Sequence, residues 1–116
     1  MKIGHVDVID KNSALIAVKE YDYALQFIPE EYIDRDICME SIKIDGWNIR
    51  YVPKELIDKE MCLEALKNDS TSIEYIPKKF LNKQLYIDAV KDNGYNIQFV
   101  PKKYMNKEIC LRSYKE

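Results

Sequence analysis

Proline recurs at a fixed interval of 24 residues in this 116-residue chain. A fixed period of about 20 to 50 residues is typical of stacked supersecondary units, each of which buries its apolar face against the next. The interval therefore predicts one repeat domain over residues 1–116, with a degenerate first unit in which His5 stands where a proline would fall. The four prolines are Pro29, Pro53, Pro77 and Pro101, and the predicted units are 1–20, 21–44, 45–68, 69–92 and 93–116.

Each unit carries the pattern of a helix of about ten residues, or roughly 15 Å. An Asp or Asn begins the pattern in every unit, and a short oxygen acceptor at that place caps the free amides of the first turn. The apolar and small residues that follow, as in the run from Ile37 to Ile42, cover about 200° of the helix, which suits a helix with a neighbour on both sides. The predicted N-caps are Asp10, Asp34, Asp58, Asn82 and Asn106.

The segment before each proline alternates apolar, polar, aromatic and aliphatic residues, as in Ile97-Gln98-Phe99-Val100. We expect a short helix over about 46–51, a break before the proline and one more turn that starts at Pro53. Gly46 and Gly94 are expected to supply the turn after the preceding helix. The prediction is an all-α, right-handed helical-repeat solenoid of about 4.5 units; one short strand plus helix per repeat, as in a leucine-rich repeat, is the alternative.

The stretch from Ile87 to Cys110, IDAVKDNGYNIQFVPKKYMNKEIC, resembles a short tandem α-helical repeat that is catalogued as a domain of unknown function. The pattern that carries the resemblance is A-V-K-x-N-G-x-x-I/L-x-Y/F-x-P, with a period of about 24 residues. The resemblance extends from about Asp10 to Lys115 and implies a helical fold. The family brings no known active site, so it assigns no functional residue to this chain.

Composition and charge exclude several classes of protein. The chain is 47% hydrophobic and 33% charged with a formal net charge of −2, which is too apolar for a disordered segment and too evenly charged for a simple polyanion binder. No apolar run reaches the roughly 18 residues that a membrane-spanning helix needs. Asp7 and Asp10 interrupt the N-terminal region where a secretory signal needs an apolar core. We therefore expect a cytoplasmic protein without membrane contact.

No arrangement of residues predicts catalysis or metal binding. Cys38, Cys62 and Cys110 share one repeat position, which Tyr86 fills in another unit. A whole unit between neighbouring sulfur atoms is too far for a disulfide or a shared metal, so these residues are predicted to be small buried hydrophobes. His5 is the only histidine, and no metalloprotease or phosphate-loop motif occurs. We expect a protein that is not an enzyme and has no cofactor.

An aromatic residue follows the turn after most of the predicted helices, with Thr71 at the same place in one unit, and these residues form the candidate surface for a protein partner. These aromatic residues either cap the hydrophobic core or are exposed anchors for a partner. The second alternative is considered because Trp, Tyr and Arg dominate binding hot spots. The polar residues of the same segment differ between units, as expected for a surface that recognises a specific partner. They are Gln26, Arg50, Glu74 and Gln98. The candidate partner-binding residues are Tyr23, Trp47, Arg50 and Tyr95.

A Lys or Arg at the start of each predicted helix forms the most regular charged column. It is a solvated edge, or a basic ridge that follows a polyanion such as nucleic acid. Glu30 and Glu31 stand at the places that lysines occupy in the last units, so the ridge weakens toward the N-terminus. The candidate residues for a polyanion are Lys59, Lys78, Lys79, Lys83, Lys102, Lys103 and Lys107.

The last predicted helix keeps the apolar residues of an internal helix, although repeat arrays normally end in a polar face. Tyr114 and Arg112 form a partial cap, or else this end face pairs with a second copy or with a partner. The sequence thus favours a non-catalytic protein-binding module, with a small inhibitor or adaptor as a specialised form. Nucleic-acid binding through the Lys-rich edge is one alternative, and a structural or oligomerisation unit is another.

Overall fold

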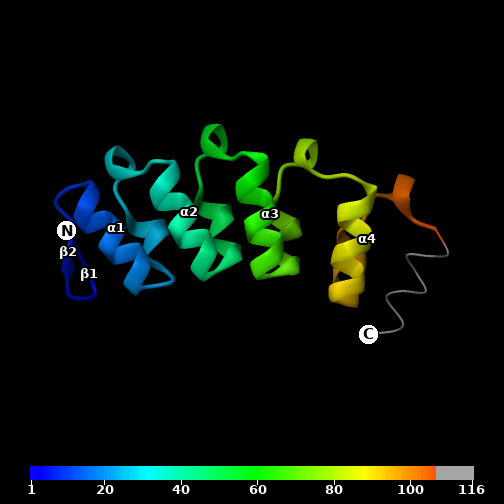
Figure 1. Cartoon of the computed structure of the whole chain (residues 1–116), viewed down its shortest axis with the longest axis horizontal. Coiled ribbons are helices and arrows are strands. Elements are labelled where there is room, and N and C mark those ends of the chain that lie inside the picture. Colours follow the sequence, from blue (N-terminus) through cyan, green and yellow to red (C-terminus); the bar gives the residue numbers. More distant parts are fainter. Residues whose placement is uncertain (107–116) are drawn as a thin grey trace.

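The protein is a row of helical units, shown in a computed structural model that describes residues 1–106 (Figure 1). The Cα atoms extend over 53 × 26 × 17 Å. The predicted all-α repeat is confirmed, and the alternative with one strand per repeat is wrong. The last predicted helix, with Lys107 and Cys110, lies outside the described residues. Within residues 1–106 the α-helices are α1 (Lys11–Glu20), α2 (Arg35–Ile44), α3 (Lys59–Asn68) and α4 (Lys83–Asp92).

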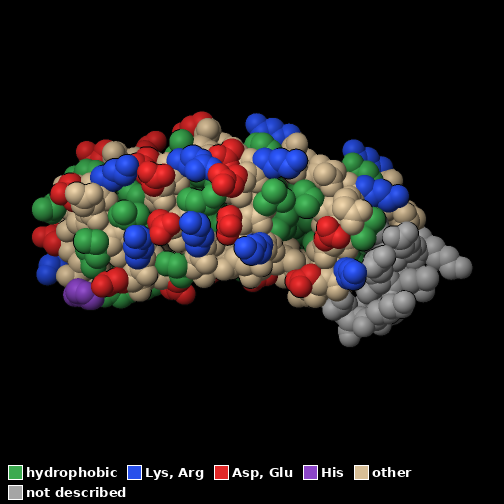
Figure 2. Space-filling view, viewed as in Figure 1, with side chains coloured by type: hydrophobic (Ala, Val, Ile, Leu, Met, Phe, Trp, Pro, Cys, Tyr) green, Lys and Arg blue, Asp and Glu red, His purple; other side chains and the backbone are tan. Residues whose placement is uncertain are grey.

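Each proline segment folds as two short 3-10 helices with a break between them, as predicted. Val52 is extended, with φ −77° and ψ 131°, because the residue before a proline avoids the helical region. The turns that follow the prolines line one edge of the molecule, at the top of Figure 1 and of Figure 2. The 3-10 helices are η1 (Ala24–Phe27), η2 (Glu30–Tyr32), η3 (Gly46–Tyr51), η4 (Lys54–Leu56), η5 (Ser70–Tyr75), η6 (Lys78–Phe80), η7 (Gly94–Phe99) and η8 (Lys102–Tyr104).

Side-chain caps begin the helices at two places in each full unit. The predicted caps of the α-helices are confirmed: Asp10, Asp34, Asp58 and Asn82 each accept a hydrogen bond from the backbone amide three residues on, at 2.8 to 3.0 Å. A second cap was not predicted. Asp45, Asp69 and Asn93 each accept from the amide two residues on, at the start of η3, η5 and η7. Local hydrogen bonds therefore cap both the α-helix and the longer 3-10 helix of these units.

Gly46 serves close packing and not a left-handed turn. Its φ is not positive, since Gly4 is the only residue with positive φ in the described part of the chain. A Cβ atom on Gly46 would lie 2.4 Å from the carbonyl oxygen of Ala65 in α3. The prediction that Gly46 supplies a turn is therefore corrected: glycine lets the start of η3 touch α3, the α-helix of the same unit.

The hydrophobic core has two parts that meet between α3 and α4. The larger part runs from the N-terminus through α1, α2 and α3, where α1 packs on α2 and α2 packs on α3. The smaller part surrounds α4 and η7. Leu66 and Leu81 contact both parts but are only half-buried themselves. The small residues Ala17, Ser41 and Ala65 are buried where neighbouring helices approach each other.

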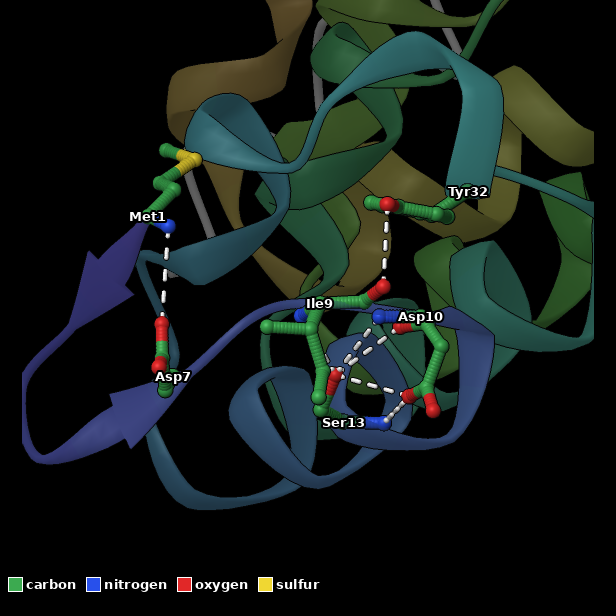
Figure 3. Close-up of polar contacts among 6 residues, drawn as sticks. All are labelled: Met1, Asp7, Ile9, Asp10, Ser13 and Tyr32. Carbon is green, nitrogen blue, oxygen red and sulfur yellow. Dashed lines mark hydrogen bonds and ion pairs between the residues drawn. The ribbon is translucent and has the colours of Figure 1, made fainter.

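A β-hairpin precedes α1 and covers the N-terminal end of the row (Figure 1). Its strands β1 (Lys2–Ile3) and β2 (Val6–Asp7) pair antiparallel around Gly4, whose φ is 59°. Figure 3 shows that the Ser13 side chain closes a capping box with Asp10 and that Tyr32 reaches back from η2. The Tyr32 hydroxyl donates to the Ile9 carbonyl oxygen at 3.0 Å and so ties the second unit to this end.

Side-chain hydrogen bonds between units join residues about one period apart. The Trp47 indole N–H donates to Thr71 Oγ1 at 2.6 Å, across 24 residues. The Asn48 amide donates to the carbonyl oxygens of Asp22 and Ser41, across 26 and 7 residues. Asn68 accepts from the Gly46 amide at 2.7 Å and donates to the Lys43 carbonyl oxygen at 3.1 Å. The Gly46–Asn68 bond lies within the unit 45–68, whereas the bonds to Thr71, to Asp22 and to Lys43 cross between units and fix the register of each unit against the next.

Candidate partner-binding surfaces

Aromatic side chains from successive 3-10 helices form a row along the molecule, which we call the aromatic row. An aromatic pair lies at each end: Tyr23 packs edge-on against Phe27, and Tyr95 against the half-buried Phe99, with ring centroids 6.2 and 5.9 Å apart. Tyr23, Phe27 and Tyr95 are 43%, 49% and 61% exposed. The row consists of Tyr23, Phe27, Trp47, Tyr51, Tyr75, Tyr95 and Phe99.

The middle of the aromatic row is more firmly built than its ends. Trp47 is half-buried, packs edge-on against Tyr75 at 5.9 Å and is bonded to Thr71. The exposed guanidinium of Arg50 lies 5.5 Å from the Trp47 ring centroid, 4.7 Å from that of Tyr51 and 5.8 Å from that of Tyr75. Trp47 therefore joins two units, while Arg50 is a cation held over three rings. Of the predicted partner-binding residues, Tyr23, Arg50 and Tyr95 are exposed.

The predicted cation column is an ion-pair ladder in the N-terminal half. Lys11 pairs with Asp34, the cap of the next helix, and lies 3.9 Å from Asp36. Arg35 pairs in the same way with Asp58, at 2.7 Å, and with Glu60. The hydrogen bond from Arg35 lowers the pKa of the Asp58 carboxyl group. Here the column holds consecutive units together, so these cations are not free to bind a polyanion.

The ladder stops at α3. The residues that Lys59 would meet, Asn82 and Gln84, are neutral, and within residues 1–106 neither Lys59 nor Lys83 makes an ion pair. The charge of the proline turns on the same edge changes along the chain as well. The first turn has Glu30–Glu31, whereas the last two have Lys78–Lys79 and Lys102–Lys103. Figure 2 shows acidic side chains at the left of this edge and basic ones at the right. Among the described residues, lysines without an ion pair are thus concentrated toward the C-terminal end of this edge. Lys107 lies outside the described residues.

A cleft of about 290 Å³ opens between α3 and α4. Leu66 and Leu85 line it and are half-buried, whereas their equivalents Ile42 and Met61 at the α2–α3 junction are completely buried. Ser70, buried at the cleft, donates to Asp92 at 2.6 Å. We call this hollow the α3–α4 cleft; its other lining residues are Lys67, Asp88 and Ala89.

Cys38 and Cys62 are buried free thiols. Burial raises the pKa of Cys38 to about 12 and that of Cys62 to about 11, so both stay protonated and unreactive at neutral pH. Among the described residues no group of three His, Cys, Asp or Glu side chains is placed to hold a metal ion. In the same part of the chain no helix has the length and apolar character needed to cross a membrane.

A family model described as a domain of unknown function (DUF4116) matches residues 34–81, from the cap of α2 to the residue before the cap of α4. The matched segment includes the ion pairs of Arg35, the Trp47 cluster and the close contact at Gly46. No curated protein matches the chain, and no solved structure does. Over these two units the chain is thus similar to a domain whose function is not known.

Proposed function

We propose that the protein is a non-catalytic module that binds another protein on its aromatic row. The observation that carries this proposal is the exposure of Tyr23 and Tyr95 at equivalent places in two units, with Phe27 exposed beside Tyr23. Exposed aromatic rings add apolar contact area at little cost in conformational entropy, and Arg50 adds a cation among them. The exposed residues Gln26, Arg50, Glu74 and Gln98 differ from unit to unit along the same segment and would give the surface its specificity.

The first test is a pull-down from native cell extract, with and without nuclease, read by mass spectrometry. We expect a stoichiometric protein that survives nuclease treatment. The Tyr23→Ala/Tyr95→Ala variant should lose it, because truncating a hot-spot aromatic costs about 2 kcal/mol or more.

Ile16→Ala/Leu63→Ala is the matched control, because both residues are exposed hydrophobic side chains on α-helices, away from the row. This control should retain the partner. Equal loss in both variants would contradict the aromatic row as the binding surface. Recovery of material that disappears entirely with nuclease would favour nucleic-acid binding instead.

A further inference from the structure

A small hollow lies between the last two described proline turns, on the basic part of the edge. Its volume is about 190 Å³. Pockets for whole small molecules measure about 300 to 1,000 Å³, so this hollow fits one side chain better than a cofactor. We call it the Tyr86 hollow; it is lined by Lys78, Leu81, Tyr86, Pro101, Lys103 and Tyr104.

Two tyrosines line this hollow. Tyr86 is only 4% exposed, and its ring packs against that of Tyr104 with the centroids 5.6 Å apart. Among residues 1–106 neither hydroxyl has a hydrogen-bond partner. Burial, with Tyr104 as a second cause, raises the pKa of Tyr86, so its phenol keeps its proton at neutral pH. The Tyr86 ring is thus nearly buried beside the hollow, and no described residue accepts a hydrogen bond from its hydroxyl, which is free to donate to a ligand.

Two lysines contribute positive charge to the same hollow. Neither Lys78 nor Lys103 forms an ion pair with any described residue. The Lys103 ammonium lies 5.0 Å from the Tyr104 ring centroid, which holds it beside the phenols. Cations next to unpartnered hydroxyl donors favour an anion, because each can then make a charge-assisted hydrogen bond.

The same register in the earlier units does not repeat this combination. One unit back, Lys54 and Lys79 keep the charge, but Cys62 replaces the phenol, and a protonated thiol is a weak donor. Two units back, Glu30 and Glu55 replace both lysines, so the place is acidic. The Tyr86 hollow is therefore a local feature of the last described turns and not a property of every repeat.

We propose that the Tyr86 hollow binds one carboxylate side chain from an acidic segment of a protein partner. The carboxylate accepts a hydrogen bond from the Tyr86 hydroxyl and pairs with Lys78 and Lys103. This inference deepens the proposed function by naming the chemistry of the partner, and it rests on that function in taking the source to be a protein.

The charge gradient favours a short acidic segment over nucleic acid. Residues 1–58 hold 7 basic and 12 acidic residues, or −5, whereas residues 59–106 hold 8 and 6, or +2. A long polyanion that extended from the hollow along the row of proline turns toward the N-terminal end would be repelled by Glu30 and Glu31. An acidic protein segment needs to cover only the two basic turns.

Fluorescence anisotropy with labelled octaglutamate and octauridylate, on the full chain at low salt, tests the proposal. We expect octaglutamate to bind more tightly than octauridylate. Lys78→Ala/Lys103→Ala should weaken octaglutamate binding about tenfold or more, and Tyr86→Phe, which removes only the hydroxyl, about threefold to tenfold. The matched control Lys54→Ala/Lys79→Ala removes the same charge one unit back and should cost less than about threefold.

Three results would overturn the proposal: no octaglutamate binding, tighter binding of octauridylate, or equal losses in the two lysine variants. Circular dichroism checks that each variant is folded. Ile16→Ala/Leu63→Ala, which changes neither the hollow nor the aromatic row, should bind octaglutamate as the unaltered chain does. Octaglutamate has no aromatic side chain, so this measurement tests the hollow, whereas the pull-down with Tyr23→Ala/Tyr95→Ala tests the aromatic row.

Discussion

The α2–α3 and α3–α4 junctions are built from the same repeat positions but pack differently. At the first junction Gly46 touches Ala65, and Asn68 bonds both the Gly46 amide and the Lys43 carbonyl oxygen. At the second, Ser70 stands in place of Gly46 and Asp92 in place of Asn68. The first junction is closed over completely buried side chains, whereas the second contains the α3–α4 cleft.

Two substitutions explain the difference. A Cβ atom at Gly46 would lie 2.4 Å from a backbone oxygen, so a serine at that place cannot be accommodated without moving the next helix away. An aspartate, unlike asparagine, has no N–H with which to bond a carbonyl oxygen, and Asp92 accepts from Ser70 instead. We therefore expect the side-chain carbon of Ser70, together with Asp92, to keep α4 away from α3.

Gly46→Ser should open the α2–α3 junction in the way that the α3–α4 junction is open. It has the largest expected effect on stability. Overpacking against the backbone of Ala65 should lower the free energy of unfolding by about 3 kcal/mol, measured by urea denaturation. The variant should also raise the hydrogen-exchange rates of amides in α3. A loss below about 1 kcal/mol would mean that the junction tolerates a Cβ and that Ser70 does not cause the cleft.

Equivalent core truncations should differ between the junctions. Ile42→Ala removes a completely buried side chain and should cost about 3 kcal/mol. Leu66→Ala, at the same repeat position beside the cleft, should cost about 1.5 kcal/mol, because its side chain is half-buried. The two midpoints of urea unfolding give the comparison directly. Equal losses would show that the cleft does not weaken packing at Leu66.

Asn68→Asp should remove the hydrogen bond to the Lys43 carbonyl oxygen and place a negative charge at the C-terminal end of α3. Both changes are unfavourable, and together they should cost about 1 kcal/mol. Asp92→Asn is the matched control, because the Ser70 hydroxyl can donate to an amide oxygen as well as to a carboxylate. Thermal unfolding of both variants should show a clear decrease only for Asn68→Asp.

Ser70→Gly should let α4 approach α3, with a change in stability of only about 0.5 kcal/mol. The closer packing of Leu66 and Leu85 offsets the lost hydrogen bonds to Asp92 and Asn96 and the added chain entropy of glycine. Methyl nuclear Overhauser effects between Leu66 and Leu85 report the closure. Ser70→Ala loses the same hydrogen bonds but keeps the Cβ atom, so it should leave the cleft open.

Much of each unit could be predicted from its own residues. The period of the prolines, the Asp and Asn caps and the apolar pattern depend on contacts within about ten residues, where sequence and structure are closely linked. The second cap at Asp45, Asp69 and Asn93 was missed, although an Asp or Asn recurs there every 24 residues. The hairpin was missed too, although Gly4 between Ile3 and Val6 is a turn signal.

Features that join units were harder to predict. Asp36 and Glu60 suit the N-terminal end of their own helices, which hides their contacts with Lys11 and Arg35 of the unit before. In the sequence Gly46 is compatible with a turn, and only the structure shows its contact with Ala65. The signal in the sequence was Ser70 at the same repeat position, because a left-handed turn disfavours serine. The Tyr86 hollow joins residues of two turns and one helix, so no single stretch of sequence indicates it.

The spacing of the bonds between units limits how such a chain can change its length in evolution. The bonds that Tyr32, Arg35, Trp47 and Asn68 make between units span 23 to 25 residues, close to one period. Duplication or deletion of one whole unit presents each donor with an equivalent acceptor. Gain or loss of part of a unit would misalign the caps, the ion pairs and the buried faces together. Inheritance in whole units is therefore the expected history of this architecture.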